Sequence, residues 1–342
     1  RQGGSTITQQ YVKQVYLNAD RTPQRKLKEA AIAIKLERKL SKKEILGRYL
    51  NEVYLGRGAT GVEAASRAYF DKDAADLDVA RRNLAEQARM RRELEIATRI
   101  QTSLVPRTVR VPGLVVSASM VPAEEVGGDY YDIIPIPDSD GGAWIGIGDV
   151  AGHGLTAGLV MMMIQSVVAA LARLHPDGSP RDLVSILNTT LHDNIRERLN
   201  QDEHVTFTLL RYHPDGRVVF AGAHEEIVVL RAATARTERI RTPGTWLGAT
   251  HDIGRFTVDN ELHLEPGDVL ALYSDGLIEG MNAAGEPFGI ERLCAALENA
   301  AHLDPAAMRD TVLAAASAFR VSQEDDVTLL VIRRDPISPR PT

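Results

Sequence analysis

Cysteine and long apolar runs are scarce in this sequence. The chain of 342 residues has one cysteine, Cys294, which excludes an intramolecular disulfide and a cysteine-rich zinc site. A reducing, cytoplasmic compartment is the simplest interpretation. The longest apolar stretch, residues 158–171, is interrupted by Gln165 and Ser166, so we expect no membrane span. The chain starts with Arg1 and lacks a signal-peptide pattern, which indicates a fragment or a processed product.

Lysine is missing from most of the chain. All 8 lysines lie at or before Lys72. Residues 1–70 contain 14 Lys and Arg against 6 Asp and Glu, whereas residues 71–342 contain 26 against 40. This shift indicates two segments of different origin. The acidic second segment argues against a nucleic-acid partner, which would need a basic face.

Residues 77–106 are expected to form a helical linker between a mostly helical segment, residues 1–76, and a larger domain. No glycine or proline occurs in residues 77–104. A narrow stripe with coiled-coil spacing is formed by apolar residues and one polar residue, Gln101: Met90, Leu94, Ala97, Gln101 and Leu104. Two interpretations stay open, a helix lying on its own domain and a helix that pairs with a second copy. We expect a weak homodimer through residues 77–104.

Residues 107–334 contain both strand and helix patterns, followed by a proline-rich tail, residues 335–342, that we expect to be disordered. The helices come in sequence pairs and the strands in runs, which favours an α+β fold with layered sheets and helices. Strands are predicted at residues 114–120, 143–147, 205–210, 217–221, 227–231, 269–273 and 327–332. Helices are predicted at residues 155–174, 180–199, 290–300 and 305–319.

Four aspartates stand at the ends of apolar segments: Asp129, Asp149, Asp275 and Asp325. An unpaired buried carboxylate is costly, and no arginine flanks these four motifs. Magnesium and manganese prefer carboxylate and carbonyl ligands, and neighbouring glycines allow the backbone to approach a shared centre. Two such ions can activate a water for attack on phosphorus. The four positions therefore predict a site for metal-dependent phosphate hydrolysis.

Residues 94–334 resemble the metal-dependent protein phosphatases of the PPM, or protein phosphatase 2C-like, family, in particular the bacterial SpoIIE and RsbU branch. Five segments carry the resemblance: Ile-Gln-Thr-Ser-Leu-Val-Pro (100–106), Pro-Ala-Glu-Glu-Val-Gly-Gly-Asp-Tyr-Tyr-Asp (122–132), Asp-Val-Ala-Gly-His-Gly (149–154), residues 273–277 and residues 325–328. The resemblance implies an α-β-β-α sandwich, two divalent cations, manganese or magnesium, and a phosphoserine or phosphothreonine protein substrate. In that branch the substrate is typically an anti-anti-sigma (STAS) regulator.

The resemblance also implies roles for individual residues. Asp149 would bridge two metals and the Val150 carbonyl would bind one of them. Asp275 and Asp325 would bind the other metal, and Asp129 would hold the outer one. Three neighbours would surround these ligands: Gly128, His153 and Asp326. The chain has Ala-His-Glu-Glu at residues 223–226 where the family often has Gly-His-Asn-Pro, and we interpret this segment as a surface loop near the site.

Residues 1–72 resemble an internal piece of the glycosyltransferase family 51 domain of penicillin-binding proteins. The motifs are Gln-Gly-Gly-Ser-Thr-Ile-Thr-Gln-Gln (2–10), Arg-Lys-x-x-Glu (25–29), the segment of residues 42–51 and the segment of residues 57–70. The vestigial motif positions are Gln9, Glu29, Lys42 and Arg57. The family's first motif, with its catalytic glutamate, precedes this piece, so we expect no sugar transfer.

Three functions remain open at this stage. The preferred one is a phosphatase with a vestigial transferase segment, which makes the chain a fusion, a chimera or a gene-model artefact. The second is a peptidoglycan glycosyltransferase-related, lipid II-binding protein with a regulatory phosphatase-like domain. The third is a binding module with an inactive phosphatase fold, against which the complete set of acidic ligands argues.

Overall fold

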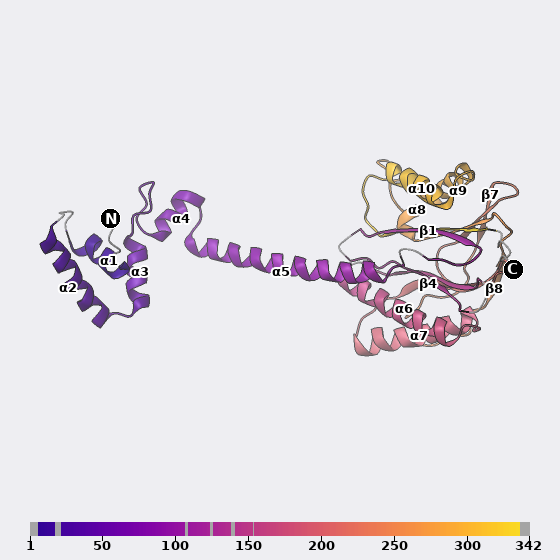
Figure 1. Ribbon diagram of the computed structural model, residues 1–342, viewed down its shortest axis with the longest axis horizontal. Helices are drawn as coiled ribbons and strands as arrows, with labels where there is room; N and C mark the ends of the chain where they lie inside the picture. The colour runs from indigo at the N-terminus through magenta and orange to yellow at the C-terminus, as the bar shows by residue number, and fades with distance from the viewer. Residues whose placement is uncertain are drawn as a thin grey trace, which may run out of the picture. The chain divides into compact units, whose positions relative to one another are not determined.

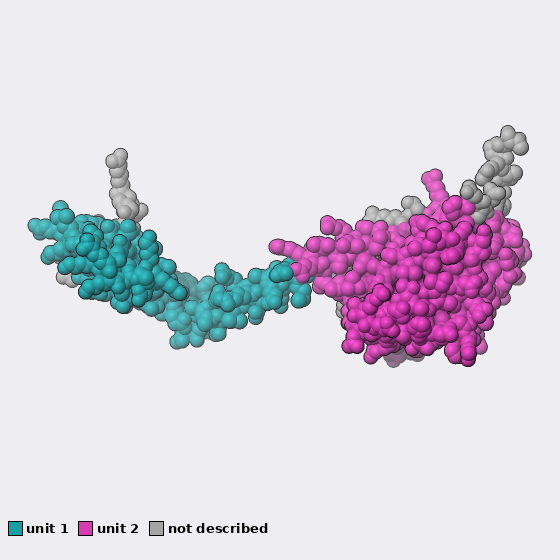
Figure 2. All heavy atoms as spheres, turned by 90° about the horizontal axis from the view of Figure 1, so that it is seen from below, with its two compact units in different colours: residues 1–91 teal, residues 92–342 magenta. Residues whose placement is uncertain are grey.

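The computed structural model describes residues 6–17, 22–106, 109–123, 126–137, 141–152 and 154–335. The chain divides into two compact units, residues 1–91 and residues 92–342 (Figure 2). The boundary lies inside the long helix α5 (Ala74–Leu104). We describe each unit by itself.

The first unit is helical, as its sequence predicts. It contains α1 (Ile7–Tyr16), α2 (Pro23–Lys39), α3 (Lys42–Glu52), α4 (Val62–Phe70) and the first part of α5. A capping box begins α3, in which the Ser41 hydroxyl accepts from Glu44 N and the Glu44 carboxylate accepts from Ser41 N. A small core includes Tyr11, Val12 and Ile45.

The second unit is built on two five-stranded antiparallel sheets. One sheet has the order β1-β10-β9-β6-β7 and the other the order β2-β3-β4-β5-β8. The strands are β1 (Leu114–Val121), β2 (Tyr130–Pro135), β3 (Ala143–Val150), β4 (Val205–Tyr212), β5 (Arg217–Ala223), β6 (Ile227–Arg231), β7 (Arg236–Ile240), β8 (Asn260–His263), β9 (Val269–Tyr273) and β10 (Val327–Arg334).

Helices cover the outer face of each sheet, which confirms the predicted layered α-β-β-α sandwich (Figure 1). α6 (Leu155–Leu174) and α7 (Pro180–His192), which continues into one π-helical turn, η1 (Asp193–Arg198), cover the second sheet; α9 (Gly289–Asn299) and α10 (Pro305–Phe319) cover the first. Alternation along each strand divides the core into layers. On β3, Ile145 and Ile147 pack between the sheets, whereas Trp144 packs under the helices.

Seven predicted strands are present, and three strands were not predicted: β2, β7 and β8. β7 reads Arg-Thr-Glu-Arg-Ile and is mostly exposed at a sheet edge, so it has no apolar alternation. β8 has four residues and lies at the edge of the other sheet. The predicted helix over residues 180–199 ends as an α-helix at His192.

By length and composition alone, one helix within the described ranges, α6, could cross a membrane, with a mean hydropathy of 2.0. Its apolar character has another explanation in the fold. Ala157, Val160, Met161, Ile164 and Val168 belong to the core between α6, α7 and the second sheet.

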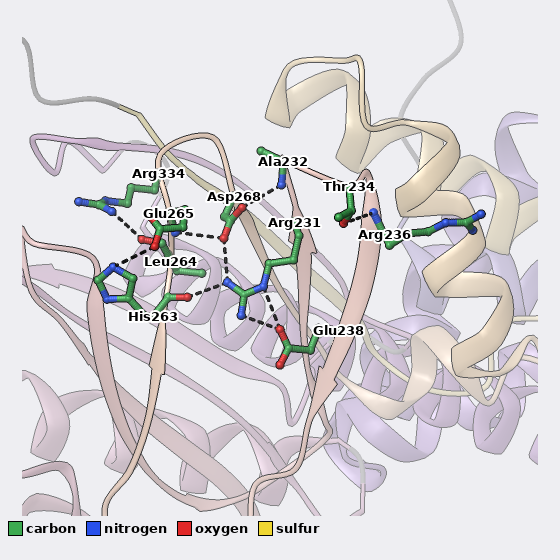
Figure 3. Close-up of polar contacts among 10 residues, drawn as sticks. All are labelled: Arg231, Ala232, Thr234, Arg236, Glu238, His263, Leu264, Glu265, Asp268 and Arg334. Atoms are coloured by element: carbon green, nitrogen blue, oxygen red, sulfur yellow. Dashed lines mark hydrogen bonds and ion pairs between the residues drawn. The ribbon is translucent and has the colours of Figure 1, made fainter.

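An ionic network ties the two sheets together at one end of the sandwich (Figure 3). Arg231, at the end of β6, donates to the Asp268 carboxylate at 2.8 Å and to the carbonyl of His263, in β8 of the other sheet, at 2.7 Å. Asp268 also accepts from Ala232 N at 2.8 Å and Glu265 N at 3.0 Å. Asp268 is 2% exposed, so its charge is buried and fully compensated.

Candidate active site

The predicted aspartates lie at the opposite end of the sandwich, next to the ends of β2, β3, β9 and β10. Asp129 directly precedes β2, and Asp149 is the second-last residue of β3. One residue separates the end of β9 from Asp275, which begins the short helix α8 (Asp275–Ile278). One residue also separates Asp325 from the start of β10. Register explains the gathering, because Tyr130 pairs with Gly148 in one sheet and Leu329 pairs with Tyr273 in the other.

Asp129 joins the two sheets at this end. One of its carboxylate oxygens, Oδ2, accepts from Ser274 Oγ at 2.7 Å and from Thr328 Oγ1 at 2.5 Å. Both hydroxyls belong to the first sheet or its adjoining loop, whereas Asp129 leads into the second. The side chain is 1% exposed, so these bonds replace the water that a carboxylate normally has.

Asp326 holds the glycine loop before Asp129. Its carboxylate accepts from Ala123 N at 2.7 Å and from Gly128 N at 2.6 Å. A Cβ at Gly127 would collide with the Asp326 carboxylate, and a Cβ at Gly128 would lie 2.9 Å from the Val150 carbonyl oxygen. Gly127 therefore leaves room for the Asp326 carboxylate, and Gly128 leaves room for the backbone of β3.

Burial and mutual repulsion raise the pKa of three of these aspartates. The pKa of Asp149 rises to about 9, mainly because of desolvation and further because of the charges of Asp129 and Asp275. Desolvation is also the main cause at Asp129, where the pKa rises to about 8, and at Asp275, where it rises to about 6. Among the described residues no cationic side chain forms an ion pair with Asp129, Asp149 or Asp275. These three carboxylates therefore lack a compensating cationic side chain within the described residues.

The donor set fits divalent cations. Asp275 Oδ1 is buried without a hydrogen-bond partner, and a Cβ at Gly128 would come within 3.3 Å of Asp149 Oδ1 and 2.9 Å of the Val150 carbonyl. In the described part of the chain no three Asp, Glu, His or Cys side chains have the arrangement of a complete metal site. At Asp129, one carboxylate oxygen, Oδ2, already accepts hydrogen bonds from two hydroxyls. Carboxylates and a carbonyl are the ligands that magnesium and manganese prefer.

A family model described as Stage II sporulation protein E (SpoIIE) matches residues 139–335. The chain belongs to this family. Its second unit has the fold of PP2C-type phosphatases. The SiaA-PP2C domain of Pseudomonas aeruginosa has a TM-score of 0.62 and 20% identity, over 73% of this chain and 99% of that one. The RsbU and RsbW domains of a Mycobacterium tuberculosis protein have a TM-score of 0.58 and 22% identity, over 69% of this chain and 63% of that one.

A transglycosylase model matches residues 1–97, which confirms the second resemblance. Penicillin-binding protein 1A of Aquifex aeolicus (strain VF5) is 55% identical over 78 residues, 23% of this chain and 11% of that protein. Penicillin-binding protein 2D of Bacillus subtilis (strain 168) is 57% identical over 76 residues, 22% of this chain and 11% of that protein. The chain thus spans about a tenth of the length of these relatives.

The vestigial transferase positions all lie in the first unit. Glu29 is 1% exposed and pairs with Arg25 at 3.2 Å and Lys26 at 2.5 Å. The Arg57 guanidinium lies 4.8 Å from the centre of the Tyr69 ring. Gln9 belongs to the capping box of α1, and Lys42 is the first residue of α3.

Two further predicted site residues of the SpoIIE-family domain are the expected ligand Asp325 and its expected neighbour His153. A Cβ at Gly276 would lie 3.1 Å from the Asp325 Cβ, so the turn after Asp275 packs on the segment before β10. Asp325 itself is exposed. His153 lies outside the described residues.

Gln101 is used differently from the sequence prediction. The stripe of α5 placed it in a helix-pairing seam, but it is 2% exposed and bonds to the loop before Asp129. Its Nε2 donates to Gly127 O at 2.5 Å, and its Oε1 accepts from Gly127 N at 3.1 Å. The C-terminal end of α5 therefore packs on its own domain, whereas Met90, further up the helix, is 61% exposed.

Residues 224–226 form the loop between β5 and β6, and all three are half-buried. The His224 imidazole lies between the two sheets, and desolvation lowers its pKa to about 4. Next to it, burial and the negative charge of Asp275 raise the pKa of Glu225. Sequence reasoning also missed Ser274 and Thr328, whose hydroxyls hold Asp129. The available signal was their position, since Ser274 directly precedes Asp275 and Thr328 follows Asp326 by two residues.

Proposed function

We propose that the SpoIIE-family domain hydrolyses phosphoserine or phosphothreonine on a protein, using two divalent cations, manganese or magnesium. The observation that carries this proposal is the group of uncompensated aspartates at one end of the sandwich, where burial and repulsion raise the pKa of Asp149 to about 9. A buried site of this charge is stabilised when cations occupy it. The PP2C-type fold supports the same chemistry.

Each residue has a distinct task in this proposal. Asp149, Asp275, Asp325 and the Val150 carbonyl would hold the cations, with Asp129 on the outer side. Bound cations lower the pKa of a water and stabilise charge that develops on phosphate oxygens. Ser274 and Thr328 fix the Asp129 carboxylate by hydrogen bonds of 2.7 and 2.5 Å. Asp326 orients the glycine loop, and Gly128 allows that loop to reach the β3 backbone.

The substrate we propose is a phosphorylated anti-anti-sigma protein of the STAS type, in the cytoplasm. Two findings support it: the chain belongs to the SpoIIE family, and its fold is similar to that of RsbU domains. The acidic loop at Glu225 and Glu226 stands where the family pattern has Asn-Pro, so the preferred substrate sequence is expected to differ from that of other members.

Hydrolysis is tested on the full chain with a phosphorylated STAS protein and with p-nitrophenyl phosphate, across a titration of Mn²⁺ and Mg²⁺. We expect no turnover in EDTA and saturable recovery when either cation is added. Full activity in EDTA would contradict the metal mechanism. Turnover of p-nitrophenyl phosphate without turnover of the phosphorylated STAS protein would contradict the proposed substrate.

A second candidate function rests on the first unit. Glu29, the acidic residue of its transferase motif, is buried between Arg25 and Lys26, and this unit is 55% identical to a penicillin-binding protein over 78 residues. We propose residual binding of lipid-linked pyrophosphate through the basic side chains of this unit. Co-sedimentation with vesicles that contain lipid II tests it, and binding equal to that of vesicles without lipid II would contradict it.

We also propose a weak homodimer through the exposed part of α5. Leu84 and Met90 are 65% and 61% exposed, although both are apolar. Sedimentation velocity of the wild type and of Leu94→Glu at tens of micromolar tests this proposal. A monomer for both proteins would contradict it.

A further inference from the structure

His224 connects two strand ends that belong to different sheets. It follows β5, and its ring nitrogens have one partner each. Nε2 lies 2.9 Å from the carbonyl oxygen of Tyr273, the last residue of β9 in the first sheet. Nδ1 lies 2.9 Å from the hydroxyl of Thr206, in β4 of the second sheet.

The partners determine where the proton of the ring sits. A carbonyl oxygen can only accept, so Nε2 carries the hydrogen and donates it to Tyr273 O. Nδ1 then has a free lone pair and accepts from the Thr206 hydroxyl. Thr242 fixes the backbone of the same residue, because its hydroxyl accepts from His224 N at 3.0 Å and donates to His224 O. The imidazole is therefore held in one tautomer and one orientation.

Both partners lie next to residues of the proposed metal site. Thr206 is the cross-strand partner of Asp149 in the β3–β4 register, and its hydroxyl lies 3.4 Å from the Asp149 carbonyl oxygen. Tyr273 is followed by Ser274, which binds the Asp129 carboxylate, and then by Asp275. One rigid ring thus spans the gap between the strand end that carries Asp149 and the strand end that carries Asp275.

We propose that His224 is a positioning residue that sets the separation of Asp149 and Asp275 and thereby the affinity of the site for its divalent cations. This inference rests on the proposed function, since it assumes that these aspartates bind metal. Groups that orient metal ligands from outside typically change metal affinity 10- to 100-fold when they are removed. Because His224 acts through Thr206 and Tyr273 rather than on a ligand, we expect the lower end of that range, about tenfold.

Three variants separate the two hydrogen bonds. His224→Ala removes both. His224→Gln places an amide donor near the position of Nε2 and keeps the bond to Tyr273. Thr206→Val keeps the shape of the β4 side chain and removes only the bond to Nδ1. His213→Gln is the matched control: His213 is a partly buried histidine that follows the opposite end of β4 and contacts Arg217.

The readouts are the dissociation constant for Mn²⁺, measured by calorimetry on metal-free full-length protein, the Mn²⁺ concentration that gives half-maximal activity, and the unfolding midpoint in EDTA. For His224→Ala we expect about tenfold weaker Mn²⁺ binding, with activity recovered at high Mn²⁺. His224→Gln and Thr206→Val should shift affinity in the same direction by less. His213→Gln should bind Mn²⁺ like the wild type.

Two results would overturn the inference. One is wild-type Mn²⁺ affinity in His224→Ala and Thr206→Val; the other is a lower unfolding midpoint in these variants with an unchanged Mn²⁺ requirement, which would make the bridge structural only. If His224→Ala does not fold, Thr206→Val decides alone. A wild type that binds Mn²⁺ but hydrolyses no phosphoprotein refutes the proposed function and leaves the affinity comparison valid. A wild type that binds neither Mn²⁺ nor Mg²⁺ overturns both.

Discussion

The two ends of the sandwich treat buried carboxylates in opposite ways, and both cases occur along β9. At the start of β9, Asp268 is 2% exposed and receives hydrogen bonds from Arg231 and from two backbone amides. At the end of β9, Asp275 has a buried oxygen without a partner, and its pKa rises to about 6 through burial and the charge of Asp325.

The contrast indicates what each end is for. A carboxylate that arginine compensates contributes to the fold and has no free ligand atom, as at Asp268 (Figure 3). Carboxylates that repel one another cost stability in the metal-free protein, and such costs are typical of functional sites. At the end with Arg231, the carboxylate helps to hold the sheets together. At the other end, the carboxylates have oxygens that can bind cations.

The largest expected effect comes from Asp149→Asn at the uncompensated end. We expect phosphatase activity to fall by about three orders of magnitude, because the bridging charge that holds the cations is lost. In EDTA at pH 7 the same variant should be more stable than the wild type by about 2 kcal/mol, since it removes a carboxylate whose pKa is raised. Urea unfolding in EDTA measures the second effect, and a clearly less stable variant would contradict our account of this end.

Asp268→Ala is the counterpart at the compensated end. We expect it to destabilise the domain by about 3 kcal/mol, because it leaves Arg231 and two backbone amides without their acceptor. Activity per folded molecule and Mn²⁺ affinity should match the wild type. A double-mutant cycle with Arg231→Met isolates the pair. A coupling energy near zero would mean that the network of Figure 3 does not hold the sheets together.

The sequence predicts the uncompensated end better than the connections around it. Asp129, Asp149, Asp275 and Asp325 could be found because each stands at the end of an apolar segment, and α6, β6 and β9 have the predicted bounds. His224 and Gln101 could not be found in this way. Each has a backbone partner, 49 residues away for His224 and 26 for Gln101, and hydrogen bonds to a backbone leave no pattern in residue types. The side-chain partner of His224, Thr206, is 18 residues away.

The third prediction concerns the pH dependence of the metal-free protein. Burial and repulsion raise the pKa of Asp275 to about 6, of Asp129 to about 8 and of Asp149 to about 9, from an ordinary value of 3.8. The folded state therefore binds more protons than the unfolded state between pH 3.8 and about 9. Its stability is greatest at the acid end of this window and falls as the pH rises.

His224 has the opposite effect on the pH dependence of stability. Burial lowers its pKa from 6.5 to about 4, so its contribution to stability increases with pH between these two values. The test therefore uses pH 6.5 to 9, above the pKa of His224 in both the folded and the unfolded state. Unfolding midpoints should decrease with pH in EDTA, whereas saturating Mn²⁺ should remove or reverse the trend, since metal binds the deprotonated carboxylates. A midpoint in EDTA that rises over this range would contradict the predicted repulsion.

The smallest expected effect comes from Gln101, a neutral side chain that contacts the loop before Asp129. Gln101 belongs to α5, and its amide makes two hydrogen bonds with Gly127, whose neighbour Gly128 is held by Asp326. Gln101→Ala leaves the Gly127 amide and carbonyl without these partners, so we expect a loss of about 1 kcal/mol in unfolding free energy. Because the loop leads directly to Asp129, activity at limiting Mn²⁺ should fall several-fold while activity at saturating Mn²⁺ stays near the wild type. Gln87→Ala, an exposed position of the same helix, is the control for helix propensity. Equal behaviour of the two variants would mean that α5 does not influence the site through Gly127, and it would restrict the ligand-positioning contacts to those between the two sheets.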